Sequence, residues 1–132
     1  MVRRIRYLTL DDVLVIIEEL RRTYPKDFIR VMNVGALEAA LDTAAYAGYG
    51  LRQFRARVAA VAASLLSLIV LNHALTDGNK RLAYLVTKAF LEANGYRVSG
   101  ALLRNLTIRV ASLSIDVKGV YKVLYNNIVK VR

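Results

Sequence analysis

Apolar residues recur at helical spacing over most of the chain, and helix-breaking residues separate the segments. Thr9 and Asp12 have the pattern of a capping box at the start of the first helix. The apolar face of this helix is made of residues three and four apart, namely Leu10, Val13, Leu14, Ile17 and Leu20. Pro25 marks its end, because a proline interrupts the backbone hydrogen bonds of a helix interior.

Three more helices are predicted in the middle of the chain. Asn33 can cap a short helix that holds Leu37, Ala40 and Leu41, and the glycines of Tyr46–Gly50 place a loop after it. A long helix should run from about Leu51 to about Leu75 and break at Thr76-Asp77-Gly78. The next should begin near Asn79, place Leu82, Leu85, Val86, Phe90 and Leu91 in the core, and end before Gly95.

The last third of the chain has a weaker pattern. Ser99-Gly100 could start a helix over Ala101–Leu113, and Asp116 could cap another that reaches Val131. The Thr, Ile and Val content of Leu106–Ile115 also allows a strand there. No repeat or linker divides the chain, so we predict one domain over residues 1–132, an all-α bundle of about six helices.

The stretch Val58–Leu71 contains no charged residue and is apolar on every side. It is shorter than the roughly 20 residues that a membrane span requires. A helix of this kind is typical of the centre of a small bundle, so we predict a core helix and no membrane span. No leader sequence is predicted, because Asp11 and Asp12 interrupt the apolar residues after the basic N-terminus, and we expect a cytoplasmic protein.

The composition narrows the chemistry. The 132 residues contain no cysteine and a single histidine, which excludes disulfides, cysteine-based zinc sites and any site with two histidine ligands. The 20 lysines and arginines against 10 acidic residues give a net charge of +10. This charge indicates an anionic partner, such as a nucleic acid, a phosphorylated ligand, an acidic protein or a membrane surface, or simply a soluble surface.

The candidate site is the stretch His73-Ala74-Leu75-Thr76-Asp77-Gly78-Asn79-Lys80-Arg81. It joins two predicted helices, and the free backbone amides at the start of the second helix form a natural anion site. Gly78 allows close approach to a phosphate, and Asn79, Lys80 and Arg81 can contact the same anion. Asp77 offers a hard oxygen ligand for Mg²⁺, and His73 is a candidate general base.

Each residue of this stretch also has a simpler interpretation. His73 could be a partly buried side chain bonded to backbone, and Asp77 could merely cap the following helix. Lys80 and Arg81 could belong to a solvated helix face. The ordered combination within nine residues favours the functional interpretation.

The stretch His73–Arg81 resembles the signature of the Fic/Doc family, in which a histidine, an apolar residue, an acidic residue, an asparagine and an arginine recur in this order. The form Asp-Gly-Asn-Lys-Arg is similar to the Doc branch, the toxins of Phd–Doc-type toxin–antitoxin modules. Val34–Leu41 and Phe90–Tyr96 are similar to the family segments on either side. The resemblance covers about residues 5 to 97, and the family fold is a compact all-α bundle.

The resemblance implies nucleotide-dependent modification of a protein hydroxyl. His73 would be the catalytic base, Asp77 would bind Mg²⁺, and Gly78, Asn79, Lys80 and Arg81 would hold the phosphates of ATP. In Doc-like proteins a lysine replaces the glycine of AMP-transferring members, which implies a protein kinase with a threonine of elongation factor Tu as its target. An antitoxin acting in trans is implied, because the inhibitory Ser/Thr-x-x-x-Glu-Gly/Asn motif is missing from the sequence.

Some residues depart from the family pattern. Ala74 and Leu75 stand where the family often has proline and usually phenylalanine, and Leu75 can still anchor the loop. Tyr84 occupies the position of the second arginine of AMP-transferring members, which argues against AMP transfer.

Three other hypotheses stay open. The same site could transfer AMP, or the domain could bind nucleotide or antitoxin without catalysis. A basic nucleic-acid-binding domain that uses Arg52–Arg57 is the third. The sequence argues against it, because no helix-turn-helix signature is present and the eight tyrosines are scattered.

Overall fold

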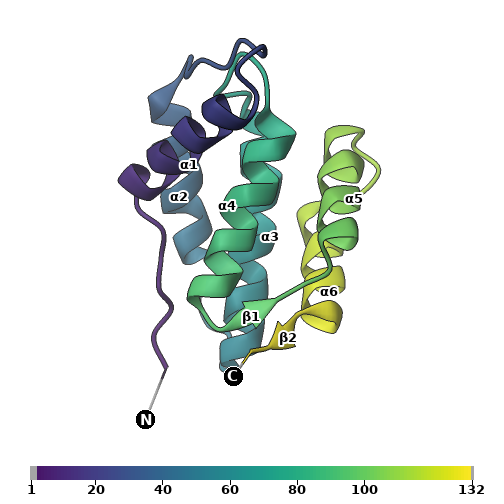
Figure 1. Cartoon of the computed structure of the whole chain (residues 1–132). Coiled ribbons are helices and arrows are strands. Elements are labelled where there is room, and N and C mark those ends of the chain that lie inside the picture. The colour runs from purple at the N-terminus through teal and green to yellow at the C-terminus, as the bar shows by residue number, and fades with distance from the viewer. Residues whose placement is uncertain (1–2, 132) are drawn as a thin grey trace.

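The computed structural model describes residues 3–131, and in that range six helices and two short strands follow one another (Figure 1). The helices are α1 (Leu10–Thr23), α2 (Val34–Tyr46), α3 (Phe54–Asn72), α4 (Asn79–Ala93), α5 (Gly100–Ala111) and α6 (Val117–Asn127). The strands β1 (Tyr96–Arg97) and β2 (Val129–Lys130) form one antiparallel pair. The predicted all-α bundle is confirmed.

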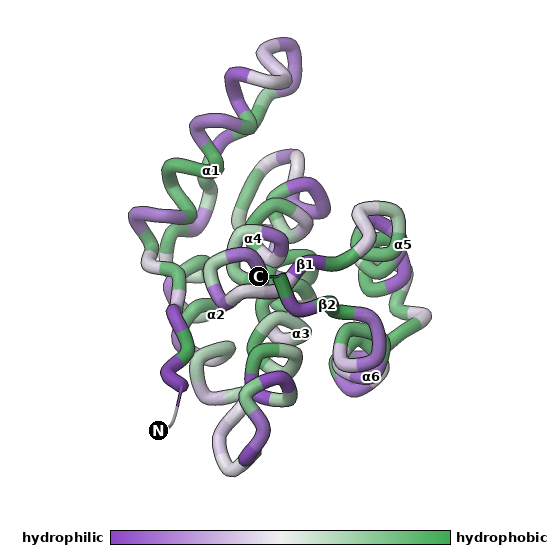
Figure 2. The backbone as a smooth tube through the Cα atoms, turned by 60° about the horizontal axis from the view of Figure 1, so that its bottom comes forward, coloured by the Kyte–Doolittle hydropathy of each residue, from purple (hydrophilic) through white to green (hydrophobic). Residues whose placement is uncertain are grey.

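Helix α3 forms the centre of the bundle and packs against α2, α4, α5 and α6 (Figure 2). Nearly all its residues from Val58 to Val70 are buried, because other helices cover it on most sides. It is the one helix in residues 3–131 that is long and apolar enough to cross a membrane by length and composition, and two thirds of the relevant window is buried. This burial supports the predicted core helix.

Several helix ends follow the sequence signals. The Thr9 side chain accepts a hydrogen bond from the Asp12 amide, and the Asp12 carboxylate accepts one from the Thr9 amide, so the capping box is confirmed. Asn33 and Asp116 cap α2 and α6 through their side chains, which accept hydrogen bonds from the amides of Ala36 and Gly119. Gly95 has a positive φ of 83° directly after the C-cap of α4, the backbone conformation for which glycine is favoured there.

The structure corrects three sequence predictions. The long helix is shorter than expected at both ends, because Leu51 and Arg52 lie in the preceding loop and His73 leaves the helical conformation. The strand considered over Leu106–Ile115 is wrong, since α5 extends through Ala111 and its apolar residues Leu103, Leu106 and Val110 pack into the core at helical spacing. The last helix ends at Asn127 instead of Val131, and the chain continues into β2.

The turn between α3 and α4 lies at one end of the bundle, and both described ends of the chain lie at the other (Figure 1). Helix α3 runs toward this turn and α4 runs away from it, so the first residues of α4 and the last residues of α3 meet there. The candidate site is therefore held by the two helices that make the most extensive contact in the molecule.

Candidate active site

His73 is the C-cap of α3 and has left-handed backbone angles, φ 49° and ψ 45°. This conformation costs a residue with a side chain about 1–2 kcal/mol. It persists because the next two residues, Ala74 and Leu75, turn into the core and are almost fully buried. Leu75 thus anchors the loop, as the sequence suggested, and the side chain of His73 stays exposed at the end of α3.

A second segment, residues 28–33, holds the loop from outside. Val31 and Leu75 form an antiparallel β-bridge, and the amide of Met32 donates to the Ala74 carbonyl at 2.7 Å. The Thr76 hydroxyl donates to the Phe28 carbonyl at 2.6 Å and accepts from the amide of Arg30 at 2.9 Å. The backbone between α3 and α4 is therefore fixed by hydrogen bonds and not left as a free loop.

Asn79 closes the turn through its side-chain amide. Its Nδ2 donates to the Leu75 carbonyl at 3.0 Å, and its Oδ1 accepts from the Leu75 amide at 3.0 Å. The carboxamide thus satisfies both backbone groups of a buried residue. One of its two amide hydrogens is used in this bond, and the other is available to a ligand.

Gly78 is the N-cap of α4, with φ 86° and no side chain to cap the helix. The amides of the first turn of α4 have no partner within the helix, so they present donors and the positive end of the helix dipole. Asp77 does not cap α4: its Oδ1 accepts from the neighbouring amide of Gly78 at 2.8 Å. The simpler interpretation of Asp77 as a helix cap is therefore wrong.

Arg81 is already paired in this structure. Its Nη1 donates to Oδ2 of Asp27 at 2.7 Å, and its guanidinium lies 3.9 Å from the ring centre of Tyr24. The hydrogen bond to Asp27 raises the pKa of Arg81. Lys80 is exposed, and neither of the two ion pairs found in residues 3–131 includes it.

One cavity of about 380 Å³ brings all the predicted site residues together. Its lining includes His73, Asp77, Gly78, Asn79, Lys80 and Arg81. We call it the motif pocket. Thr76, the last turn of α3 and Ala111 at the end of α5 complete its lining among residues 3–131.

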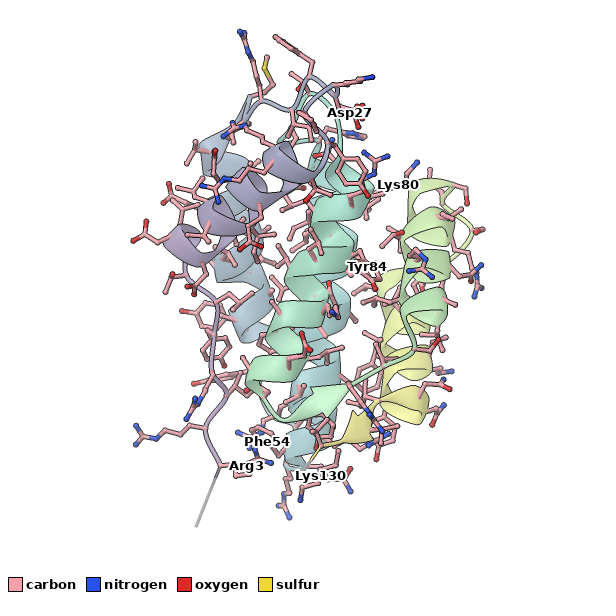
Figure 3. The ribbon with its side chains drawn as sticks, in the orientation of Figure 1. Arg3, Asp27, Phe54, Lys80, Tyr84 and Lys130 are labelled. Carbon is pink, nitrogen blue, oxygen red and sulfur yellow. The ribbon has the colours of Figure 1, made fainter. Side chains whose placement is uncertain are left out.

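A second cavity of about 440 Å³ adjoins the motif pocket, because Lys80 and Arg81 line both. It lies between α1, α4 and α5 and is mostly apolar, with Tyr84, Leu85 and Ile108 in its walls and Arg104 as a third cation. Figure 3 shows Lys80 at the start of α4 and Tyr84 one turn further along, on the side of α4 that faces α5. An anion in the motif pocket could thus continue into an apolar cavity of ligand size.

A magnesium ion would find one protein carboxylate in this site. Within residues 3–131 no group of three or more histidine and acidic side chains gathers in one place. Asp77 lines the motif pocket and uses one carboxylate oxygen on the Gly78 amide, which leaves the other for a ligand. This set fits Mg²⁺, which commonly binds through one or two carboxylates together with substrate phosphates and water.

The sequence did not reveal every residue at this site. Asp27 and Tyr24 contact Arg81 from the loop after α1, and Thr76 connects that loop to the motif. Asp27 and Arg81 are 54 residues apart, and no spacing rule joins a lone acidic residue after Pro25 to the motif. The residues of α5 in the adjoining cavity were also missed, because their segment follows the recognised motif and could not be placed against it.

Fold and site together define an all-α protein that presents a histidine, a carboxylate and two cations at the open start of a helix. The chain belongs to the Fic/DOC family, whose model matches residues 7–91, which confirms the resemblance seen in the sequence. It is also similar to Toxin Doc of Mycolicibacterium smegmatis (strain ATCC 700084 / mc(2)155), with 37% identity over 71 residues. The matched region covers 54% of this chain and 54% of that protein, so the chain spans about half the length of this relative. No solved structure matches the chain.

Proposed function

We propose that this protein is a Doc-like toxin that transfers a phosphoryl group from a nucleoside triphosphate, ATP by resemblance, to a hydroxyl side chain of a protein. The observation that carries the proposal is the motif pocket, where one base, one carboxylate and two cations line a single cavity beside the start of α4. Phosphoryl transfer depends mainly on positioning and charge neutralisation, and a small, rigid set of this kind can supply both.

His73 is the proposed general base. In the transfer, the target hydroxyl oxygen forms a bond to the γ-phosphorus, the bond to the β,γ-bridging oxygen breaks, and the nucleoside diphosphate leaves. His73 accepts the hydroxyl proton, and its exposed position at the end of α3 gives a protein substrate access to it. The left-handed backbone directs the chain into the core after His73, so the base is fixed to the rigid end of a buried helix.

The amides of the first turn of α4, with Gly78, Lys80 and Arg81, are proposed to hold the phosphates, and Mg²⁺ would neutralise phosphate charge beside Asp77. Asn79 keeps its proposed phosphate contact through its remaining amide hydrogen, while its main role here is to hold Leu75. The apolar cavity that shares Lys80 and Arg81 is the proposed place of the nucleoside. Arg81 would release Asp27 and bind a phosphate instead, because the parallel N–H donors of a guanidinium match both a carboxylate and a phosphate.

The partners are proposed from the family. A translation elongation factor is the target by resemblance, and an antitoxin acting in trans would restrain the enzyme in the cytoplasm. Transfer of AMP at the same site is the second candidate. There the hydroxyl would attack the α-phosphorus and diphosphate would leave. Lys80 and Tyr84 argue against it, since AMP-transferring relatives use glycine and arginine at these positions.

Intact-mass spectrometry tests the proposal. Purified elongation factor is incubated with this protein and Mg-ATP, and the same reaction is run with His73→Ala, a truncation of an exposed side chain that should leave the fold unchanged. We expect a phosphate-sized gain that the variant reduces by about 10²- to 10⁴-fold in rate, while the variant still binds Mg-ATP. An AMP-sized gain would replace phosphate transfer by AMP transfer. Equal activity of the variant would remove His73 from the reaction.

A further inference from the structure

A second cationic surface lies at the opposite end of the molecule from the motif pocket (Figure 3). The chain forms a groove of about 420 Å³ there between its N-terminal segment, the loop after α2 and the first turn of α3. Arg3, Arg4 and Arg57 line this groove together with Tyr7 and Tyr49, and within residues 3–131 its lining contains no acidic residue. We call it the basic groove. Figure 3 shows Arg3 and Phe54 at this end and Lys80 at the other.

Two of the three arginines of the basic groove lie on an aromatic ring and have no carboxylate partner among residues 3–131. The guanidiniums of Arg3 and Arg57 lie 4.1 and 5.6 Å from the ring centre of Phe54, and Arg57 Nη2 donates to the Arg3 carbonyl at 3.1 Å. The ion pairs of residues 3–131 involve neither side chain. Two cations on one ring repel each other, and a bound anion would relieve this repulsion.

Two exposed tyrosines line the basic groove, and a third lies against one of them. Tyr49 is 87% exposed, and Tyr46, which forms an edge-to-face pair with it at 6.2 Å, is 71% exposed. Tyr7 is 50% exposed and bonds through its hydroxyl to the Ala45 carbonyl, which fixes its ring against α2. Rings as exposed as these contribute little to the core. The fold therefore collects tyrosines that are scattered in the sequence into one aromatic set beside three arginines.

We propose that the basic groove binds single-stranded nucleic acid, with phosphates on Arg3, Arg4 and Arg57 and bases stacked on Tyr49 and its neighbours. A cationic groove lined with exposed aromatic rings is the arrangement by which proteins bind single strands without reading their sequence. The carboxylates of an acidic polypeptide could also pair with the arginines. Such a polypeptide has no planar bases to stack on the exposed tyrosine rings, so it would leave the rings unused. This binding is separate from the proposed transfer reaction, since the two sites lie at opposite ends of the bundle.

Binding is measured by fluorescence anisotropy with a labelled single-stranded oligouridylate of about 12 nucleotides, a length within the range that single-strand grooves contact. Three phosphate contacts predict that log K falls against log salt with a slope of about −2. In a parallel titration, poly-glutamate is added as a competitor of the labelled oligonucleotide. This titration tests the acidic-polypeptide alternative. The intact chain is used throughout.

Substitutions on exposed side chains locate the binding. Arg4→Glu should weaken binding and reduce the salt slope, whereas Lys88→Glu makes the same charge change on the exposed face of α4 and should have a much smaller effect. Tyr49→Ala should weaken binding by about 5- to 100-fold, and Tyr49→Phe, which keeps the ring, should restore it. Circular dichroism checks that each variant is folded.

Four results would overturn the proposal. The first is no binding of the oligonucleotide at low salt. The second is an equal loss in Lys88→Glu and Arg4→Glu, which would show attraction by net charge alone. The third is a loss in Arg81→Ala as large as in Arg4→Glu, which would place the strand in the motif pocket. The fourth combines two observations: poly-glutamate displaces the oligonucleotide when both are present at the same concentration of negative charges, and Tyr49→Ala has no effect on binding. This result would assign the groove to an acidic polypeptide.

Discussion

The two ends of this bundle stabilise their cations differently. At the motif pocket, Arg81 is held by a carboxylate at 2.7 Å and by the ring of Tyr24, and the surrounding backbone is fixed by hydrogen bonds to residues 28–33. At the basic groove, Arg3 and Arg57 lie on the ring of Phe54 without an acidic partner. The side chains and backbone of the motif pocket are therefore held in place by hydrogen bonds. The basic groove has cations and exposed rings with few such bonds.

This difference matches two kinds of recognition. Chemistry on a phosphate requires groups fixed to within a fraction of an ångström, and the network around Thr76 and Asn79 supplies that rigidity. Binding of a flexible polyanion tolerates loose contacts, because most of its free energy comes from released counterions. If both proposals hold, variants at one end should leave binding at the other end unaffected.

Among variants that change nucleotide affinity or stability, the largest effect is expected from Arg81→Ala. Charge-assisted hydrogen bonds are worth about 1.5–3 kcal/mol, so Mg-ATP should bind about 10- to 150-fold more weakly in isothermal titration calorimetry. Arg4→Ala is the matched control, since it removes an exposed arginine from the opposite end. If both variants lose the same affinity, nucleotide binding depends on overall charge and the comparison between the ends is wrong.

Much of the fold was predictable from local sequence signals. Thr9, Asn33 and Asp116 cap helices where their side chains indicated, and the helix that contains the uncharged stretch Val58–Leu71 forms the core. The errors came where local preference competes with packing. Leu106–Ile115 has strand-forming residue types, yet α5 is helical because Leu103, Leu106 and Val110 reach the core only at helical spacing. The pairing of β1 with β2 joins segments about 30 residues apart and left no local signal.

The sequence placed the candidate site residues near one another, and it indicated less about their contacts. The sequence brought His73 through Arg81 together because they are consecutive, and they line one cavity. It proposed a phosphate contact for Asn79 and gave no sign that this side chain also bonds to the backbone of Leu75. The partners of Arg81 and the aromatic set around the basic groove depend on tertiary contacts between distant segments, which periodicity cannot indicate.

A smaller effect is expected from Asn79→Ala, which breaks the fixed geometry without removing charge. The Leu75 amide and carbonyl would lose their side-chain partner, and such unsatisfied groups cost about 1–3 kcal/mol in the free energy of unfolding. Urea denaturation measures this loss. Asn126→Ala, an exposed asparagine at the far end of α6, should change stability by less than about 0.5 kcal/mol. Equal stability of the two variants would show that Asn79 does not hold the loop.

The smallest effect is expected from Asp27→Asn, and it has the opposite sign. The carboxylate of Asp27 is bonded to the guanidinium of Arg81, which we propose to bind a phosphate. A nucleotide must therefore displace this carboxylate. An exposed ion pair is worth about 0.2–1 kcal/mol, and its removal should therefore tighten Mg-ATP binding by about 1.5- to 5-fold.

Glu18→Gln is the control for this competition, because it removes the carboxylate from the other ion pair, Arg21–Glu18, and should leave nucleotide affinity unchanged. The stacking of Arg81 on Tyr24 remains in Asp27→Asn and keeps the guanidinium at the edge of the motif pocket. Weaker binding in Asp27→Asn would mean that Asp27 orients Arg81 for the phosphate instead of competing with it. The Arg81–Asp27 ion pair would then be part of the fixed geometry of the motif pocket. The difference from Arg3 and Arg57, which have no acidic partner, would be larger.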